Sequence, residues 1–175
     1  EKIMLNAGVH ASMLTLNTTG TVEPRFSAKF QLAKKTALTA AYGLHGQMLP
    51  IGVYLLEIDG QTPNKNLKMA QSHHAVIGFE QILGNNVRVL LEGYYQHMFN
   101  VPVSITDSSF WFFNLRDNYG NSAFTSQGTG RNYGVDLSIE KAFRNHFFLL
   151  GSASLKRSLY TALDGEERRT RTDNI

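Results

Sequence analysis

Hydrophobic and polar residues alternate along most of the chain with a period of two, which is the pattern of a β-strand whose two faces differ. In the clearest segment, residues 132–140, the odd positions are hydrophobic and the even positions are polar or glycine. Further segments with this alternation begin at Ile3, Arg25, Leu38, His74, Val87 and Phe147. The pattern predicts an all-β protein of about seven long antiparallel strands.

The connections between these segments alternate between short and long. Short connections at 33–36, 84–86 and 144–146 carry residues typical of hairpin turns. Two long stretches, 48–72 and 101–128, lie between them. Loops beyond about 15 residues are uncommon in compact soluble domains, whereas outer-membrane barrels have short turns at one end and longer loops at the other. The connections therefore favour an up-and-down meander that is part of a large transmembrane β-barrel.

Alternation alone does not separate a membrane barrel from a soluble β-sandwich, because a sandwich also has one apolar and one polar face. Two features favour the membrane. The strands run to roughly 10–14 residues, which exceeds the globular mode of about 5–6 and suits a tilted bilayer crossing of about 9–11. Aromatic residues also lie near strand ends, as in interfacial girdles, although ordinary β-propensity places aromatics in strands too. These aromatics are Phe30, Tyr42, Tyr95, Phe99, Tyr133, Phe143 and Phe147.

Composition changes this picture little. The chain has 175 residues, a formal net charge of +3 and 18% charged residues. Its basic residues are scattered except for Arg168, Arg169 and Arg171, which we interpret as a solvated loop, so no nucleic-acid partner is expected. The lack of cysteine excludes disulfides and thiolate sites, and no apolar run reaches the roughly 18 residues of a transmembrane helix. The chain starts at Glu1 within a patterned segment and without a signal peptide, so we expect residues to precede it.

Residues 64–81 resemble a segment found in TonB-dependent outer-membrane receptors. In those proteins a loop ending in Asn-Pro-x-Leu-Lys-Pro-Glu-x-Ser leads into a strand with a Gly-x-Glu core. The present sequence matches the loop at its asparagine, its Leu-Lys pair and its serine, and it has the Gly-x-Glu core at Gly78 and Glu80. It departs from the family pattern at Lys65, Met69 and Ala70.

Further segments follow in the order expected for such a receptor. Residues 89–96 resemble the next barrel strand with its aromatic pair, and residues 132–141 resemble a Gly-Val-Glu-Leu strand in which Asp136 replaces Glu. Residues 96–103 and 128–132 are similar to receptors of the Bacteroidetes type. The resemblance extends over most of the chain, and its specificity lies in the order and spacing of the motifs.

The resemblance implies that residues 1–175 are a single incomplete barrel segment, an internal fragment of the C-terminal half of a barrel of about 22 strands. The plug domain and the remaining strands would lie outside this chain. It further implies the outer membrane of a Gram-negative bacterium and TonB-dependent uptake of a nutrient, such as a metal chelate, vitamin, glycan or peptide. The partners would be the lipid bilayer, the plug domain and rest of the barrel, the energy-coupling TonB complex and a small-molecule or oligomeric ligand. The alternative is a non-transporting structural or adhesion outer-membrane β-protein.

Charged residues on the polar strand faces are expected to face the barrel lumen, whereas Phe26, Ile77 and Leu137 on the other faces are expected to contact lipid. The lumen-facing set is Arg25, Lys29, Glu80, Arg88, Glu92, Asp136 and Glu140. Paired carboxylates can act as acid and base catalysts. Here cations share the same faces, and we interpret the set as a network of opposed charges. The sequence predicts no catalytic residue, no enzymatic activity and no cofactor.

The long loops carry the candidate ligand contacts. Residues 108–114 hold the only Trp of the chain among aromatic and small polar residues, a composition that suits recognition of apolar or ring-shaped ligands. The predicted ligand contacts are Tyr54, Phe110, Trp111, Phe112 and Arg116. The alternative is that these side chains pack against the barrel rim or the plug.

Histidines are the remaining candidates for chemistry. His73 and His74 are adjacent in the sequence, so on a strand they point to opposite faces and cannot easily share one ion. His10, His45 and His74 are expected on the polar face, and imidazole suits transition metals. We interpret them as scattered polar lumen residues and predict no metal site.

Overall fold

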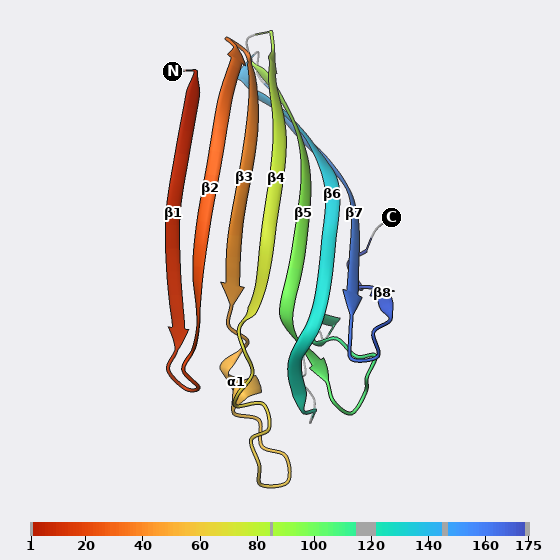
Figure 1. Cartoon of the computed structure of the whole chain (residues 1–175). Helices are drawn as coiled ribbons and strands as arrows, with labels where there is room; N and C mark the ends of the chain where they lie inside the picture. The colour runs from red at the N-terminus through yellow and green to blue at the C-terminus, as the bar shows by residue number, and fades with distance from the viewer. Residues whose placement is uncertain (1, 85, 115–121, 145–146, 174–175) are drawn as a thin grey trace.

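The computed structural model describes residues 2–84, 86–114, 122–144 and 147–173, and for 142–144 it describes the backbone alone. Eight strands form one antiparallel sheet in which each strand pairs with its neighbours in sequence (Figure 1). The strands are β1 (Ile3–Leu14), β2 (Thr19–Ala33), β3 (Thr36–Gln47), β4 (Ala70–Leu83), β5 (Val87–Ser104), β6 (Phe124–Arg144), β7 (Phe147–Thr161) and β8 (Glu167–Arg169). The prediction of an all-β, antiparallel up-and-down meander is confirmed.

Strand β8 was not predicted, because its sequence Glu-Arg-Arg has no hydrophobic alternation. Arg168 and Arg169, interpreted from the sequence as a solvated loop, instead pair with Tyr160 and Leu159 of β7. The chain reverses there through Gly165, which has a φ of 76° that favours glycine. Arg168 and Arg169 are therefore held at the sheet edge, whereas Arg171 lies in the exposed turn that follows β8.

The long connections are shorter than predicted, spanning 48–69 and 105–123. Strand β5 continues to Ser104, but its pairing with β6 shifts register between Met98 and Val103. These irregularities break the period of two, so the sequence pattern ends before the strand does. The described parts of both long connections lie at the same end of the sheet as the turn between β1 and β2, opposite the turn between β2 and β3 (Figure 1).

The pairing registers align the hydrophobic positions of neighbouring strands. One row crosses the sheet through Leu5, Ala28, Ala40, Ile77, Gly93, Val135 and Leu155. The polar positions align in the same way on the other face. A slip of one residue at any strand would exchange the two faces, so the alternation fixes the register.

The apolar face of this sheet is open to its surroundings. Phe26, Ile77 and Leu155 are 54%, 57% and 65% exposed. Each of the strands β1 to β7 has at least one exposed large hydrophobic side chain on this face. A water-soluble monomer rarely exposes a contiguous apolar surface of this kind. The sheet therefore does not have the core of an ordinary soluble domain on this face.

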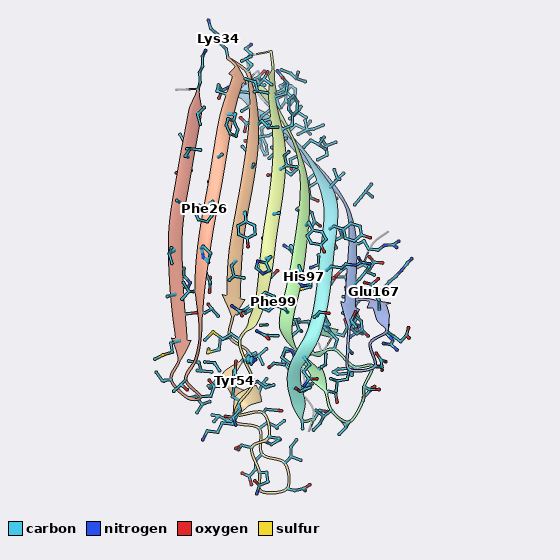
Figure 2. The ribbon with its side chains drawn as sticks, viewed as in Figure 1. Phe26, Lys34, Tyr54, His97, Phe99 and Glu167 are labelled. Carbon is cyan, nitrogen blue, oxygen red and sulfur yellow. The ribbon has the colours of Figure 1, made fainter. Side chains whose placement is uncertain are left out.

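The buried hydrophobic residues gather instead at the loop end. Here the short helix α1 (Ile51–Tyr54) and the 3-10 turn η1 (Phe112–Asn114) pack against the strand ends. Figure 2 labels Tyr54, the last residue of α1, at this end and Lys34 at the opposite end. We call the described loop residues 48–69 and 105–114 the loop cap. No helix among the described residues is long and apolar enough to cross a membrane.

Candidate functional site

The polar face carries a cluster of opposed charges toward the tight-turn end. Glu80 Oε2 lies 2.9 Å from Arg88 Nη2 and 3.6 Å from Lys29 Nζ, and Arg88 Nη1 lies 3.8 Å from Glu140 Oε2. Four of the seven residues expected to share a lumen face are thus in direct ionic contact. The interpretation as a charge network fits this geometry.

A second charged group, centred on Glu23 of β2, was missed by the sequence analysis. The Glu23 side chain is 1% exposed and accepts hydrogen bonds from Thr21 Oγ1 at 2.6 Å and Arg25 Nη2 at 2.8 Å. His10 Nδ1 lies 3.2 Å from the same carboxylate. The sequence does contain a signal for this group. Glu23 and Arg25 occupy alternate positions of one strand, so their side chains lie on the same face.

Glu92 and Asp136 also share the polar face, directly opposite one another on β5 and β6. Like charges in such positions are unfavourable, so a nearby cation is needed. Lys156 lines the same concave pocket, whose volume is about 400 Å3. Asp136 Oδ1 is buried and has no hydrogen-bond partner within the described part of the chain. The pocket is therefore lined by two carboxylates and one ammonium group.

Neutral polar side chains connect four strands across the same face. Asn132 Nδ2 donates to Gln96 Oε1 at 3.0 Å, Ser158 Oγ donates to Asn132 Oδ1 at 2.6 Å, and Thr170 Oγ1 donates to Ser158 Oγ at 2.7 Å. Gln96 Nε2 lies 3.4 Å from His74 Nδ1, which extends the chain of contacts to β4. We call the polar row formed by Arg25, His74, Gln96, Asn132 and Ser158 the polar trough.

The predicted ligand aromatics lie in the core of the loop cap. Tyr54, Trp111 and Phe112 are 0%, 1% and 5% exposed, and Phe110 packs against the same core. Burial raises the pKa of the Tyr54 hydroxyl, which accepts a hydrogen bond from the backbone N–H of Leu49. These side chains pack as in the alternative considered from the sequence, and their contact with a ligand stays a prediction. Arg116 lies outside the described residues.

The cap covers the loop end of the sheet's polar face. The rings of Trp111 and Tyr160 have centroids 5.0 Å apart, and the Trp111 ring lies on Gly130, where a Cβ would collide with it. Phe113 lines a pocket together with His74 and Gln96 of the polar trough. A ligand that enters from the loop end would therefore meet the cap before the trough.

Two asparagines that the sequence analysis did not single out hold the cap together. Asn64 is fully buried: its Nδ2 donates to the Ser122 carbonyl at 3.1 Å, and its Oδ1 accepts from the Phe124 N–H at 2.8 Å. Asn17 Nδ2 donates to the carbonyl oxygens of Lys65 and Leu67, both at 2.9 Å. The loop from β3 to β4 is thus tied to the first hairpin and to β6.

Aromatic and histidine rings form a band on the opposite, apolar face near the loop end. Tyr42 Oη lies 2.7 Å from His73 Nδ1. The rings of His73 and Phe99 are stacked, with their centroids 5.3 Å apart. His97 stacks on Phe99 at 6.4 Å, and both are labelled in Figure 2. Two of the seven predicted strand-end aromatics, Tyr42 and Phe99, thus contact the same histidine, His73, which the predicted girdle did not include. The Phe143 side chain lies outside the described residues.

The described residues contain no group of three or more His, Cys, Asp or Glu side chains arranged to hold a metal ion. No protein-family model matches the chain, and a search of curated proteins finds no match. The two faces of the sheet, the cap and the sequence motifs are therefore the features that bear on function.

Proposed function

We propose that the chain is part of the wall of a large outer-membrane β-barrel, with its apolar face toward lipid and its polar face toward the lumen. The observation that carries this proposal is that burial is inverted in the sheet. Large hydrophobic side chains are exposed on strands of 12 to 21 residues, while side chains on the opposite face form ion pairs and hydrogen bonds such as Arg88–Glu80 and Asn132–Gln96. A β-sandwich needs a second layer over its apolar face. Here the described loops lie over the loop end of the polar face instead.

Within that barrel we assign the chain to a TonB-dependent receptor of the Bacteroidetes type that takes up a nutrient, a metal chelate, vitamin, glycan or peptide. The ordered motif resemblance supports this assignment. The polar trough supports it as well, because its amide, hydroxyl and imidazole groups can exchange hydrogen bonds with a polar ligand. The plug domain and the TonB complex are the partners that such transport requires.

One observation favours the alternative of a structural or adhesion outer-membrane protein. Tyr54, Trp111 and Phe112 fill the core of the loop cap, so three of the predicted ligand contacts are withheld from solvent. A protein without cargo would need a stable cap and no ligand contacts. The two functions therefore differ in whether these three side chains contact a ligand.

The membrane assignment is tested by single-cysteine labelling of the whole protein in outer membranes, in a cysteine-free background. Because this chain has no cysteine, each substitution is unique within it. We expect Ile77→Cys and Leu137→Cys to react with a lipid-soluble maleimide and to resist a water-soluble one. Val76→Cys and Ser138→Cys, on the other face, are the matched controls. Equal reaction of all four positions with the water-soluble reagent contradicts the proposal.

Transport is tested separately by nutrient uptake in cells that produce the whole receptor. Uptake of its nutrient should stop when the energy-coupling complex is inactivated, while the amount of receptor in the membrane stays the same. A protein that assembles normally but supports no energised uptake belongs to the structural class.

A further inference from the structure

Two histidine rings meet on the polar face beneath the loop cap. His45 of β3 and His74 of β4 have ring centroids 4.5 Å apart and ring planes tilted by 42°. In the strand register His74 is opposite Gly43, and His45 is opposite Ser72, so the histidines are diagonal neighbours. A Cβ at Gly43 would lie 2.8 Å from His45 Nε2. The ring of His45 thus lies over Gly43, beside His74, because position 43 has no side chain.

The surroundings of this pair offer further donor atoms. Both histidines line a pocket of about 420 Å3 together with Ser72, Gln96 and Met98. The Ser72 hydroxyl oxygen is buried and has no hydrogen-bond partner within the described ranges. Gln96 Nε2 lies 3.4 Å from His74 Nδ1. An ion bound at His74 Nε2 would place the ring proton on Nδ1, where a turned Gln96 amide would accept it through its oxygen. Imidazole, hydroxyl and thioether groups therefore converge on one pocket.

We propose that His45 and His74 form an open binding site for a divalent transition-metal ion such as Zn²⁺, Cu²⁺ or Ni²⁺. Imidazole nitrogens bind such ions at about 2.0–2.1 Å, which sets the centroids of two adjacent ligand rings roughly 4.5–5 Å apart. The observed separation of 4.5 Å lies at the lower end of this range. Two protein ligands leave the other coordination positions to water, to Ser72 or to donor atoms of an incoming ligand.

The local charge permits a cation at this point. Arg25 lines the adjoining pocket with both histidines, but its guanidinium donates to the buried Glu23 carboxylate at 2.8 Å. That ion pair offsets the positive charge that faces the histidines. Metal binding does not depend on the proposed transport function. Its role as a transient contact for a metal-bearing nutrient does rest on that function.

The test is metal binding by the whole protein in detergent micelles, with Zn²⁺ measured by calorimetry and Cu²⁺ by electron paramagnetic resonance. We expect His45→Ala and His74→Ala each to weaken Zn²⁺ binding at least tenfold. The Cu²⁺ spectrum should lose the signature of two imidazole nitrogens. The matched control is His97→Ala, which removes an exposed histidine on the opposite face and should leave both measurements unchanged.

Gly43→Ala keeps both histidines and is the second variant. It should weaken binding because its methyl group displaces the His45 ring. Circular dichroism confirms that each variant is folded before it is compared. Unchanged binding in the folded His45 and His74 variants, or equal loss in His97→Ala, overturns the site. If the wild-type protein supports energised uptake but binds no metal, the metal site is wrong and the proposed transport function stands. If it binds metal but supports no energised uptake, the transport function is wrong and the metal site stands.

Discussion

The strands and the loop cap of this protein follow opposite rules of burial. In the cap, Val53 and Tyr54 are fully buried and Trp111 is 1% exposed, as in a water-soluble core. In the strands, Ile77 and Leu155 are more than half exposed, while the polar side chain of Glu23 is 1% exposed. The two regions belong to one chain and share strand ends, so composition alone does not explain the difference.

The difference indicates that the two regions have different surroundings. Burial in the cap stabilises it by about 25 cal/mol per Å2 of apolar surface removed from water. The sheet instead keeps its apolar surface outward and satisfies its backbone through strand pairing, which is the solution that a lipid environment requires. Under the proposed function the cap is in water and the strands are in the bilayer. The predictions below test that contrast.

The largest expected effect is in the cap core. Trp111→Ala removes a side chain that packs against Tyr160 and covers Gly130, and such truncations cost about 3–5 kcal/mol. We expect the loop cap to become sensitive to protease while the strands stay protected. The control is Phe113→Ala, which truncates a neighbouring ring that is 41% exposed. Equal protease sensitivity of the two variants contradicts the assignment of Trp111 to the core.

The next effect concerns the apolar face of β6. Leu137 lies between Leu91 and Ala153 on that face, whereas Ser138 points to the other face. An arginine on the lipid side near the midplane costs about 2–4 kcal/mol. Leu137→Arg should therefore reduce the folded, membrane-inserted fraction far more than Ser138→Arg, as measured by the heat-dependent gel shift of folded barrels. If both variants assemble equally, the apolar face does not contact lipid.

A smaller effect is expected at Asn64. Asn64→Ala leaves the buried Phe124 N–H without its acceptor, and an unsatisfied buried group costs about 1–3 kcal/mol. Amide hydrogen exchange at Phe124 should accelerate, while exchange in β1 to β4 stays the same. Asn66→Ala, in the exposed part of the same loop, is the control and should have little effect. Unchanged exchange in Asn64→Ala would show that the cap is held by its apolar core alone.

The strands were predictable from the sequence because hydrophobic residues mark one face of each strand and polar residues mark the other. Alternation around Leu137 and Ile77 predicted both the strands and their faces, and pairing then followed from the order of short turns. The same parity placed Lys29, Glu80 and Arg88 on one face, where they form ion pairs. Such information is local, since a period of two needs only a few residues to be read.

The cap and the histidine pair were not predictable, because they depend on contacts between distant segments. Asn64 contacts Phe124 across 60 residues, and nothing in its neighbourhood marks it as buried. Trp111 was assigned to ligand contact from its composition, but its position in the core depends on Gly130 of another strand. His45 and His74 meet only because the strand register sets His74 opposite Gly43.

The smallest expected effect is a pH dependence at the turn before β8, outside the proposed bilayer. The guanidinium of Arg168, which donates to Asp164, holds the pKa of that carboxyl below its ordinary value. A lowered pKa in the folded state means that the ionised Asp164 stabilises the turn above the ordinary carboxyl pKa. This contribution disappears as the pH falls through the lowered value.

The measurable consequence is at Glu166, whose backbone N–H donates to Asp164 Oδ1 at 3.1 Å. Its amide should be protected from exchange at neutral pH and lose that protection in acid, after correction for the intrinsic exchange rate. The pair is on the surface, so high salt should reduce the protection as well. In Asp164→Asn the side chain carries no charge at any pH, and the acid-dependent loss should vanish while the protease resistance of the loop cap stays the same. The opposite result is an equal loss of Glu166 amide protection in Asp164→Asn and in the parent protein as the pH falls. It would show that the backbone, and not the ion pair, holds the turn.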